Sequence, residues 1–144
     1  MSEKTFTAEV VVRLTSSMTE GKPTQVINEC YIVKLVNDVA SQILIKHDGD
    51  EGICLQLTNI KFKKPLYSGD VIKIEGVLDS ETSTTRVMSF KGFRTIKNRL
   101  LIKQPSNFIY LDEPESVLEA EGVYAVPLFY QKDREDVTDW RDDT

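Results

Sequence analysis

One stretch of this chain, residues 26–46, restricts the possible folds more than any other. Its polar residues recur at intervals of three and four positions, while apolar residues cover most of the remaining circumference. The polar stripe consists of Lys34, Asn37, Asp38, Ser41 and Gln42. This pattern predicts one helix of about 20 residues, about 30 Å long, that is buried on nearly all sides. A strongly curved sheet is the simplest structure that can wrap such a helix.

The segments around this helix predict strands. Residues 5–14 alternate between apolar and polar side chains, which is the period of a strand with one buried face. A polar loop over 15–25 leads into the helix, and Gly49 is expected to end the helix in the left-handed conformation. The order predicts one α+β domain over residues 1–131, in which an antiparallel sheet wraps around the helix, followed by a charged, mobile tail over 132–144. The further strands are expected at 53–62, 71–79, 84–96 and 117–129, with a weaker pattern at 100–103 and turns at 65–70, 79–83 and 104–107.

The composition excludes several classes of protein. With 144 residues, 40% hydrophobic and 28% charged, the chain fits one globular domain. No apolar run approaches the roughly 18 to 20 residues of a membrane span, and the first residues lack the apolar centre of a signal peptide. We therefore expect a cytoplasmic protein without a membrane partner. Cys30 and Cys54 lie among apolar residues and are expected to be buried, reduced thiols.

The sequence does not predict a metal site. The chain has one histidine, His47, so a His-rich site is excluded. His47 lies close to Asp48, Asp50 and Glu51, but a calcium loop of the EF-hand type needs ligands over about twelve residues and a closing glutamate, which is absent here. We expect His47 to cap the C-terminus of the helix, where a positive charge is favourable.

Charge is unevenly distributed along the chain. The net charge is -5, yet residues 82–111 contain six basic residues and no acidic one. The basic stretch favours a phosphate-bearing ligand, unless the acidic residues that follow fold back on it or stay solvated. An overall acidic chain repels a phosphate backbone, so nucleic acid is not expected as a partner.

Several segments of the chain resemble a known family. The phrase Phe62-Lys63-Lys64-Pro65-Leu66-Tyr67-Ser68-Gly69-Asp70-Val71 resembles the hotdog fold of acyl-CoA thioesterases and hydratases, although part of it is ordinary hairpin chemistry. Residues 43–52, together with Asp38-Val39, resemble the hotdog ammonia-lyases that act on 3-aminobutyryl-CoA and β-alanyl-CoA. Glu113-Pro114 and residues 119–127 extend this similarity, which covers about residues 8–130.

The segment before the helix departs from the family pattern. In the family, the loop resembles Asp-Ala-His-Tyr, a variable residue and Gly-Asn, and the helix begins Asn-Gly-Ala-Arg. Here residues 18–25 replace that loop, and the helix begins Asn28-Glu29-Cys30-Tyr31. Asn28 is retained, the loop's His, Tyr and Gly are absent, and a glutamate of the family helix appears as Gln42.

The resemblance implies a β-aminoacyl-CoA ammonia-lyase, which eliminates ammonia reversibly to give an enoyl-CoA. The reaction needs a base for the α-proton, a group that holds the amine, and donors for the enolate oxygen. Backbone N–H groups near Asn28 and Glu29 are candidate donors. Glu29 is a candidate base or counter-ion of the amine, or merely a favourable acid in the first helical turn. Asp38 resembles an acid that hotdog enzymes carry near the dimer seam, or else it pairs with Lys34.

The resemblance also directs attention to the basic stretch as a site for the phosphates of CoA. Arg86 and Arg94 share one face of a strand while Lys91 and Lys97 share the other, so one groove can use only one pair. The candidates are Arg86, Lys91, Arg94, Lys97 and Arg99. Coenzyme A, as part of the substrate, is the only cofactor expected.

The edge strand and the helix stripe both need cover, which predicts a homodimer or a higher hotdog oligomer, alone or with a paralogous subunit. Two rival functions stay open: an acyl-CoA thioesterase, and a non-catalytic partner subunit that binds acyl-CoA.

Overall fold

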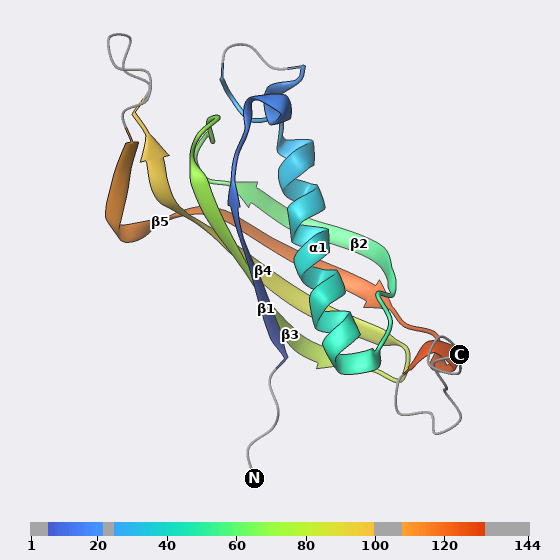
Figure 1. Cartoon of the computed structure of the whole chain (residues 1–144). Helices are drawn as coiled ribbons and strands as arrows, with labels where there is room; N and C mark the ends of the chain where they lie inside the picture. The colour runs from blue at the N-terminus through green and yellow to red at the C-terminus, as the bar shows by residue number, and fades with distance from the viewer. Residues whose placement is uncertain (1–5, 22–24, 100–107, 132–144) are drawn as a thin grey trace, which may run out of the picture.

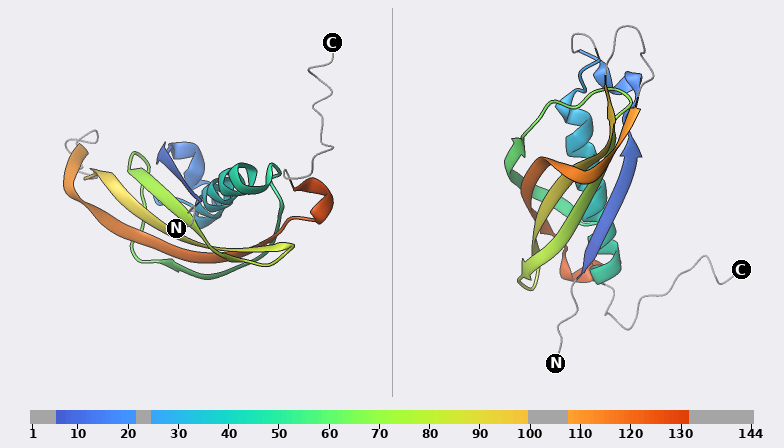
Figure 2. Two further views of the ribbon diagram at one scale, coloured as in Figure 1. Left: turned by 90° about the horizontal axis from the view of Figure 1, so that it is seen from below. Right: turned by 90° about the vertical axis from the view of Figure 1, so that its left-hand side faces the viewer.

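A computed structural model describes residues 6–21, 25–99 and 108–131 of the chain. Within these ranges the strands pair antiparallel in the order β1-β3-β4-β5-β2, and the long helix α1 lies along the concave face of the curved sheet (Figure 1, Figure 2). The elements are β1 (Thr7–Arg13), η1 (Ser16–Thr19), α1 (Glu29–Asp48), β2 (Ile53–Phe62), β3 (Val71–Glu81), β4 (Thr85–Asn98), β5 (Phe108–Ala125) and η2 (Leu128–Tyr130). The predicted α+β architecture, with a sheet curved around one helix, is confirmed.

The helix begins later than its apolar pattern predicts. Val26 forms a β-bridge with Tyr67, and the Ile27 N–H donates to the Leu66 carbonyl at 2.8 Å, so these residues are extended rather than helical. The helix ends as predicted, because Gly49 has a left-handed φ of 77° and its N–H donates to the Ile45 carbonyl at 2.9 Å.

The strands follow the predicted order, and β5 differs most in length. It begins at Phe108, well before the predicted residue 117, because residues 108–110 continue the pairing with Ile96–Asn98 of β4. It ends at Ala125, after which Pro127 leads into η2. The segments 100–103 and 104–107 and the tail 132–144 lie outside the described residues.

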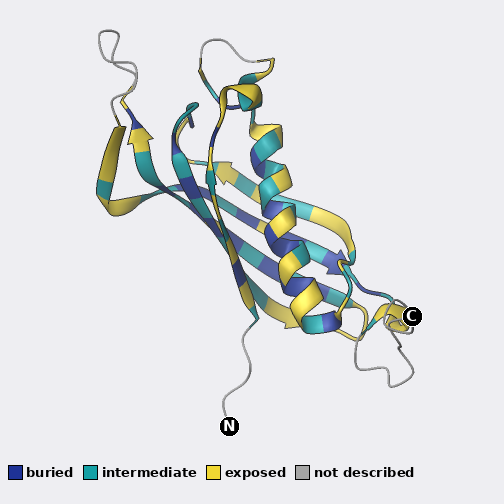
Figure 3. Ribbon diagram, viewed as in Figure 1, coloured by how far each residue is buried: buried dark blue, intermediate teal, exposed yellow. Residues whose placement is uncertain are grey.

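Only one side of α1 is buried in the single chain, so the prediction of a helix enclosed on nearly all sides is wrong at this level (Figure 3). Its buried side packs mainly on β3 and β1, and each fully buried aliphatic side chain contributes about 1.5–3 kcal/mol. Gly76 of β3 allows this close approach, since a Cβ there would lie 2.8 Å from Cγ1 of Val39. The buried helical residues are Ile32, Val36, Val39, Ala40, Ile43, Leu44 and Asp48.

Both cysteines differ from their predicted burial. Cys30 in the first turn of α1 and Cys54 on the edge strand β2 are free thiols, as predicted, but both are exposed. Cys54 is exposed because β2 has a paired neighbour on one side only. In the described residues, no helix has the length and apolarity needed to cross a membrane.

Candidate functional site

A cavity of about 230 Å³ lies beside the N-terminus of α1. One wall comes from the residues that lead into the helix and its first turn, and the other from the end of β2 and the segment after it. The lining residues are Val26, Ile27, Glu29 and Ile32 on the helix side and Phe62, Lys63, Lys64, Pro65 and Leu66 on the other. Six of these are apolar, and the charged ones are Glu29, Lys63 and Lys64, so the lining suits a short aliphatic group with charged or polar atoms next to it.

Asn28 holds the first turn of α1 in place. Its side-chain Oδ1 accepts a hydrogen bond from the Cys30 N–H at 3.0 Å, and its Nδ2 donates to the Glu20 carbonyl at 3.0 Å. The Asn28 N–H donates to the Met18 carbonyl at 2.8 Å. These groups are engaged within the chain, so Asn28 acts as a helix cap. Its predicted role as a donor to the substrate therefore gains no support from this geometry.

Glu29 and Asp38, the two predicted catalytic acids, lie at different places on α1. Glu29 is exposed in the first turn and lines the cavity, where the positive end of the helix dipole favours negative charge. Asp38 lies on the exposed side of the helix and is not among the lining residues. In the described part of the chain, no ion pair joins Asp38 to Lys34. The single chain therefore brings one of the two acids to the cavity.

Hydrogen bonds join the two walls of the cavity. The Ile27 N–H donates to the Leu66 carbonyl at 2.8 Å, and the Ser68 N–H donates to the Gln25 carbonyl at 2.9 Å. The bridge between Val26 and Tyr67 lies between these two bonds. The segment between β2 and β3 therefore positions the start of α1, although the two are far apart in the sequence.

Arg94 lies behind the second wall, in a buried cluster with two acids. The residue is 2% exposed, and its Nη1 donates to Asp70 Oδ2 at 2.9 Å while its Nη2 donates to Glu115 Oε2 at 2.9 Å. Burial would raise the pKa of Glu115, but hydrogen bonds from Lys64 and Arg94 hold this pKa below its ordinary value. Both of these guanidinium contacts are made to the chain's own carboxylates, so we do not propose Arg94 as a contact of the CoA phosphates.

Arg86 forms a second buried cluster at the C-terminal end of α1. Its Nε and Nη2 donate to the two oxygens of Asp48 at 3.0 and 2.9 Å. Burial alone would raise the pKa of Asp48, yet the hydrogen bonds from Arg86 and His47 bring it below its ordinary value. His47 lies between this carboxylate and Glu81, with its Nε2 2.9 Å from Glu81 Oε2. Arg86 therefore stabilises the fold through this ion pair, and we do not propose it as a contact of the CoA phosphates either.

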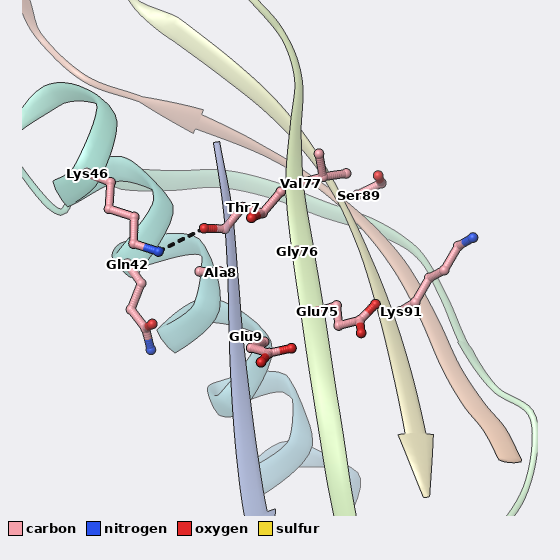
Figure 4. A pocket seen from close by; sticks show the side chains of 10 residues that line it. All are labelled: Thr7, Ala8, Glu9, Gln42, Lys46, Glu75, Gly76, Val77, Ser89 and Lys91. Carbon is pink, nitrogen blue, oxygen red and sulfur yellow. Dashed lines mark hydrogen bonds between the residues drawn. The ribbon is translucent and has the colours of Figure 1, made fainter. Parts of the chain in front are cut away.

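The three remaining basic candidates are exposed, but they do not form one group. Lys97 and Arg99 flank Asn98, whose Nδ2 donates to the Ser68 carbonyl at 2.7 Å, so they lie at the cavity end of the molecule. Lys91 instead lines an open groove of about 640 Å³ around β1 (Figure 4), in which Lys46 donates from its Nζ to the Thr7 carbonyl at 2.9 Å. Glu9 and Glu75 line the same groove, so its charge is mixed.

The sequence reasoning missed the second wall of the cavity. Phe62, Lys63, Lys64, Pro65 and Leu66 all belong to the phrase that carried the resemblance to the hotdog fold. The sequence interpretation treats that phrase as a sign of the hotdog fold and in part as hairpin chemistry, and it does not predict that the phrase lines a cavity. Pro65 and the turn at Gly69-Asp70 were the available signal. Such residues restrict the backbone to one conformation, and a segment with a fixed conformation can form the wall of a cavity.

Sequence comparison gives one strong similarity. No family model matches the chain. A 3-aminobutyryl-CoA ammonia lyase from Acetoanaerobium sticklandii is 33% identical over 101 residues, which cover 70% of this chain and 79% of that protein. The matched length is enough to compare the two proteins over most of a domain.

Solved structures with the same fold include a lyase and a thioesterase. The β-alanyl-CoA:ammonia lyase from Clostridium propionicum superposes with a TM-score of 0.82 at 18% identity and covers 87% of each chain. Cj0915, a hexameric hotdog fold thioesterase of Campylobacter jejuni, superposes with a TM-score of 0.63 at 15% identity and covers 86% of each chain. At these identities the likeness establishes the hotdog fold.

Proposed function

We propose a function from the premise that this chain belongs to the 3-aminobutyryl-CoA ammonia lyase family: it eliminates ammonia from a β-aminoacyl-CoA thioester and leaves an enoyl-CoA. The observation that carries the proposal is the cavity beside α1, whose lining combines apolar side chains and two lysines with one carboxylate, Glu29, at the positive end of a helix. The reverse reaction, addition of ammonia to an enoyl-CoA, uses the same groups.

Glu29 is the residue on which the chemistry depends. In the elimination the α-carbon loses a proton to a base, the electron pair forms the new double bond, and the bond to the β-nitrogen breaks. The Glu29 carboxylate can accept that proton, or it can hold the ammonium group that leaves. The start of α1 lies beside it, and the helix dipole stabilises the negative charge that develops on the thioester oxygen.

Our proposal includes a second copy of the chain, which pairs with the edge of the sheet and covers the exposed side of α1. β2 is an edge strand whose Ile53 and Leu55 are each 59% exposed, and an apolar edge of this kind favours pairing with another strand. The exposed side of α1 carries Asp38, which a partner subunit would cover. We therefore propose a homodimer through β2, within which Asp38 contributes to catalysis, and the cytoplasm stays the predicted location.

Lys97 and Arg99 are the proposed contacts of the CoA phosphates. Both are exposed, and both flank the residue that fixes the segment next to the cavity. Neither makes an ion pair with another residue that the structure describes, so each could bind a phosphate without breaking such a pair. Lys91 lines the open groove rather than the cavity, so it is a weaker candidate for a phosphate contact. Coenzyme A enters as part of the substrate, and the proposal includes no other cofactor.

The experiment measures ammonia, enoyl absorbance and free thiol in parallel after the purified chain is mixed with 3-aminobutyryl-CoA, β-alanyl-CoA, crotonyl-CoA and butyryl-CoA. Release of ammonia with a rise in enoyl absorbance supports the lyase. Free thiol without ammonia supports the thioesterase, in which Glu29 would activate water. Thermal stabilisation by the esters without turnover indicates a binding subunit.

Glu29→Gln tests the carboxylate itself, with Glu51→Gln as the matched control. Glu51 is also exposed, and it lies just beyond the opposite end of α1. We expect Glu29→Gln to lower kcat by about 100-fold or more, since general acid–base groups contribute about 10²–10⁴-fold. Glu51→Gln should match the wild-type chain. Equal activity of the two variants would remove Glu29 from the mechanism.

A further inference from the structure

We propose that Arg94 is a positioning residue for the cavity beside α1, because it fixes the spacing of the two walls without lining the cavity. The inference rests on the proposed function, since it assigns Arg94 to the same site. Arg94 acts through the segment between β2 and β3, and three sets of contacts connect it to Glu29.

The first set ties Arg94 to both ends of that segment. Its Nη1 donates to the Pro65 carbonyl at 3.2 Å and to Asp70 Oδ2 at 2.9 Å. Pro65 lines the cavity, whereas Asp70 closes the turn before β3 and is 0% exposed. A single guanidinium nitrogen therefore holds the cavity wall against the buried end of the turn.

The second set makes this anchor rigid. Asp70 Oδ2 also accepts from the Tyr67 N–H at 3.0 Å, and its Oδ1 accepts from the Asn98 N–H at 2.7 Å. On the other side of the guanidinium, the Nε and Nη2 of Arg94 donate to Glu115 Oε2 at 3.1 and 2.9 Å. Charge-assisted hydrogen bonds of this number restrict both partners to one geometry. Lys64, which lines the cavity, bonds to the other oxygen of Glu115 at 2.7 Å.

The third set transmits the position of the wall to the helix. Leu66 lies next to Pro65, and its carbonyl accepts from the Ile27 N–H at 2.8 Å. Ile27 precedes the cap residue of α1, so a shift of this wall moves the start of the helix and, with it, Glu29. Lysine cannot replace the planar fork of arginine, because its ammonium group cannot reach Pro65, Asp70 and Glu115 in one geometry.

Arg86 provides a matched control on the same strand. Arg86 and Arg94 are each 2% exposed, and each donates through Nε and Nη2 to a carboxylate. The Nη1 of Arg86, however, donates to the Thr82 and Thr85 carbonyls, at the far end of the molecule from the cavity. Both Arg→Lys changes should destabilise the fold, but only the change at Arg94 should alter the cavity.

The experiment compares Arg94→Lys with Arg86→Lys by two measurements well below both melting temperatures. Amide hydrogen exchange over residues 63–70 should be at least about tenfold faster in Arg94→Lys than in Arg86→Lys. Turnover of 3-aminobutyryl-CoA should show kcat/KM about 10- to 100-fold lower in Arg94→Lys, since misplacement by about 1 Å costs about 10²-fold. Most of the loss should be in kcat, because the proposed phosphate contacts are unchanged. Arg86→Lys should stay within about threefold of the wild-type chain.

The outcomes separate the two proposals. Equal exchange over residues 63–70 in both variants, or equal loss of kcat/KM, overturns the positioning role of Arg94. A wild-type chain that releases no ammonia overturns the proposed function, and the exchange comparison then still decides the role of Arg94 in the wall. If Arg94→Lys does not fold, Glu115→Gln removes the partly exposed anchor, with Glu121→Gln on the same strand as control.

Discussion

A substitution at Gly76 tests how closely α1 packs on the sheet. In Gly76→Ala the new Cβ would lie 2.8 Å from Val39 Cγ1 and 3.0 Å from two ring carbons of Phe90. Val39 and Phe90 are fully buried, so neither can move into solvent. Overpacking of this kind costs about 1–3 kcal/mol, and the reduced freedom of the unfolded chain returns about 0.4–1 kcal/mol. The free energy of unfolding should therefore fall by about 1–2 kcal/mol.

A double-mutant cycle with Val39→Ala isolates the close contact. Val39→Ala alone should cost about 2–3 kcal/mol, from two buried methyl groups at about 0.8 kcal/mol each and the cavity they leave. It also removes the atom that the new Cβ would meet at 2.8 Å. The double variant should therefore lose at least about 1 kcal/mol less than the sum of the single losses. Urea unfolding followed by far-ultraviolet circular dichroism gives all the required free energies.

Val36→Ala is the control for this cycle. Val36 is buried on the same helix, one turn before Val39, but it is not among the nearest atoms to the new Cβ. Its cost should add to that of Gly76→Ala within about 0.5 kcal/mol. Unfolding free energies that add equally well in both cycles, or a Gly76→Ala variant as stable as the wild-type chain, would refute the packing argument.

Three further predictions use other parts of the structure. Asp48→Asn should lower stability by about 3–5 kcal/mol at neutral pH, because it removes the buried carboxylate that pairs with Arg86 and leaves only the longer contact to the exposed Glu81, at 3.4 Å. The pKa of Asp48 is lowered in the folded state, so this carboxylate stabilises the fold above its unfolded pKa of about 3.9. That contribution is lost as the pH falls through the lower folded pKa, and urea midpoints of the two proteins should converge in acid. Leu55→Lys should convert the proposed dimer into a monomer of 16.4 kDa by light scattering, whereas Val11→Lys, at a similarly exposed position on the opposite edge strand, should not. Burial raises the pKa of Tyr124, so ultraviolet titration of Tyr124→Phe should lose the last phenol to ionise, and no change in that step would contradict the assignment.

Much of the fold could be predicted because its signals are local. The alternation over residues 5–14 and the helical period over residues 26–46 each follow from a few neighbouring residues, and Gly49 marks the end of the helix. The start of the helix could not be predicted from its apolar run, because Val26 and Ile27 bond to Tyr67 and Leu66, which are distant in the sequence. Exposure of Cys54 follows from the position of β2 at the sheet edge, which strand patterns alone do not specify.

The candidate site was predicted in part. Glu29 does line the cavity, as its place at the helix start suggests. The shared face of Arg86 and Arg94 was also predicted, but it is the buried face of β4. Their partners, Asp48 and Asp70, are 38 and 24 residues away in the sequence, so no local pattern shows the ion pairs. The role of Asp38 stays a prediction until the oligomer is measured.

The bonds between residues 25–27 and 66–68 have a consequence for how this family can diverge. They hold the residues that lead into α1 from the side of β3, in addition to the bonds that Asn28 makes to the Met18 and Glu20 carbonyls of the preceding loop. Residues 18–25 differ from the family loop in nearly every side chain, yet Asn28 still caps the helix. Natural selection can therefore exchange the side chains of that loop while the register of the helix stays constant, because the loop's bonds to Asn28 use only its backbone carbonyls.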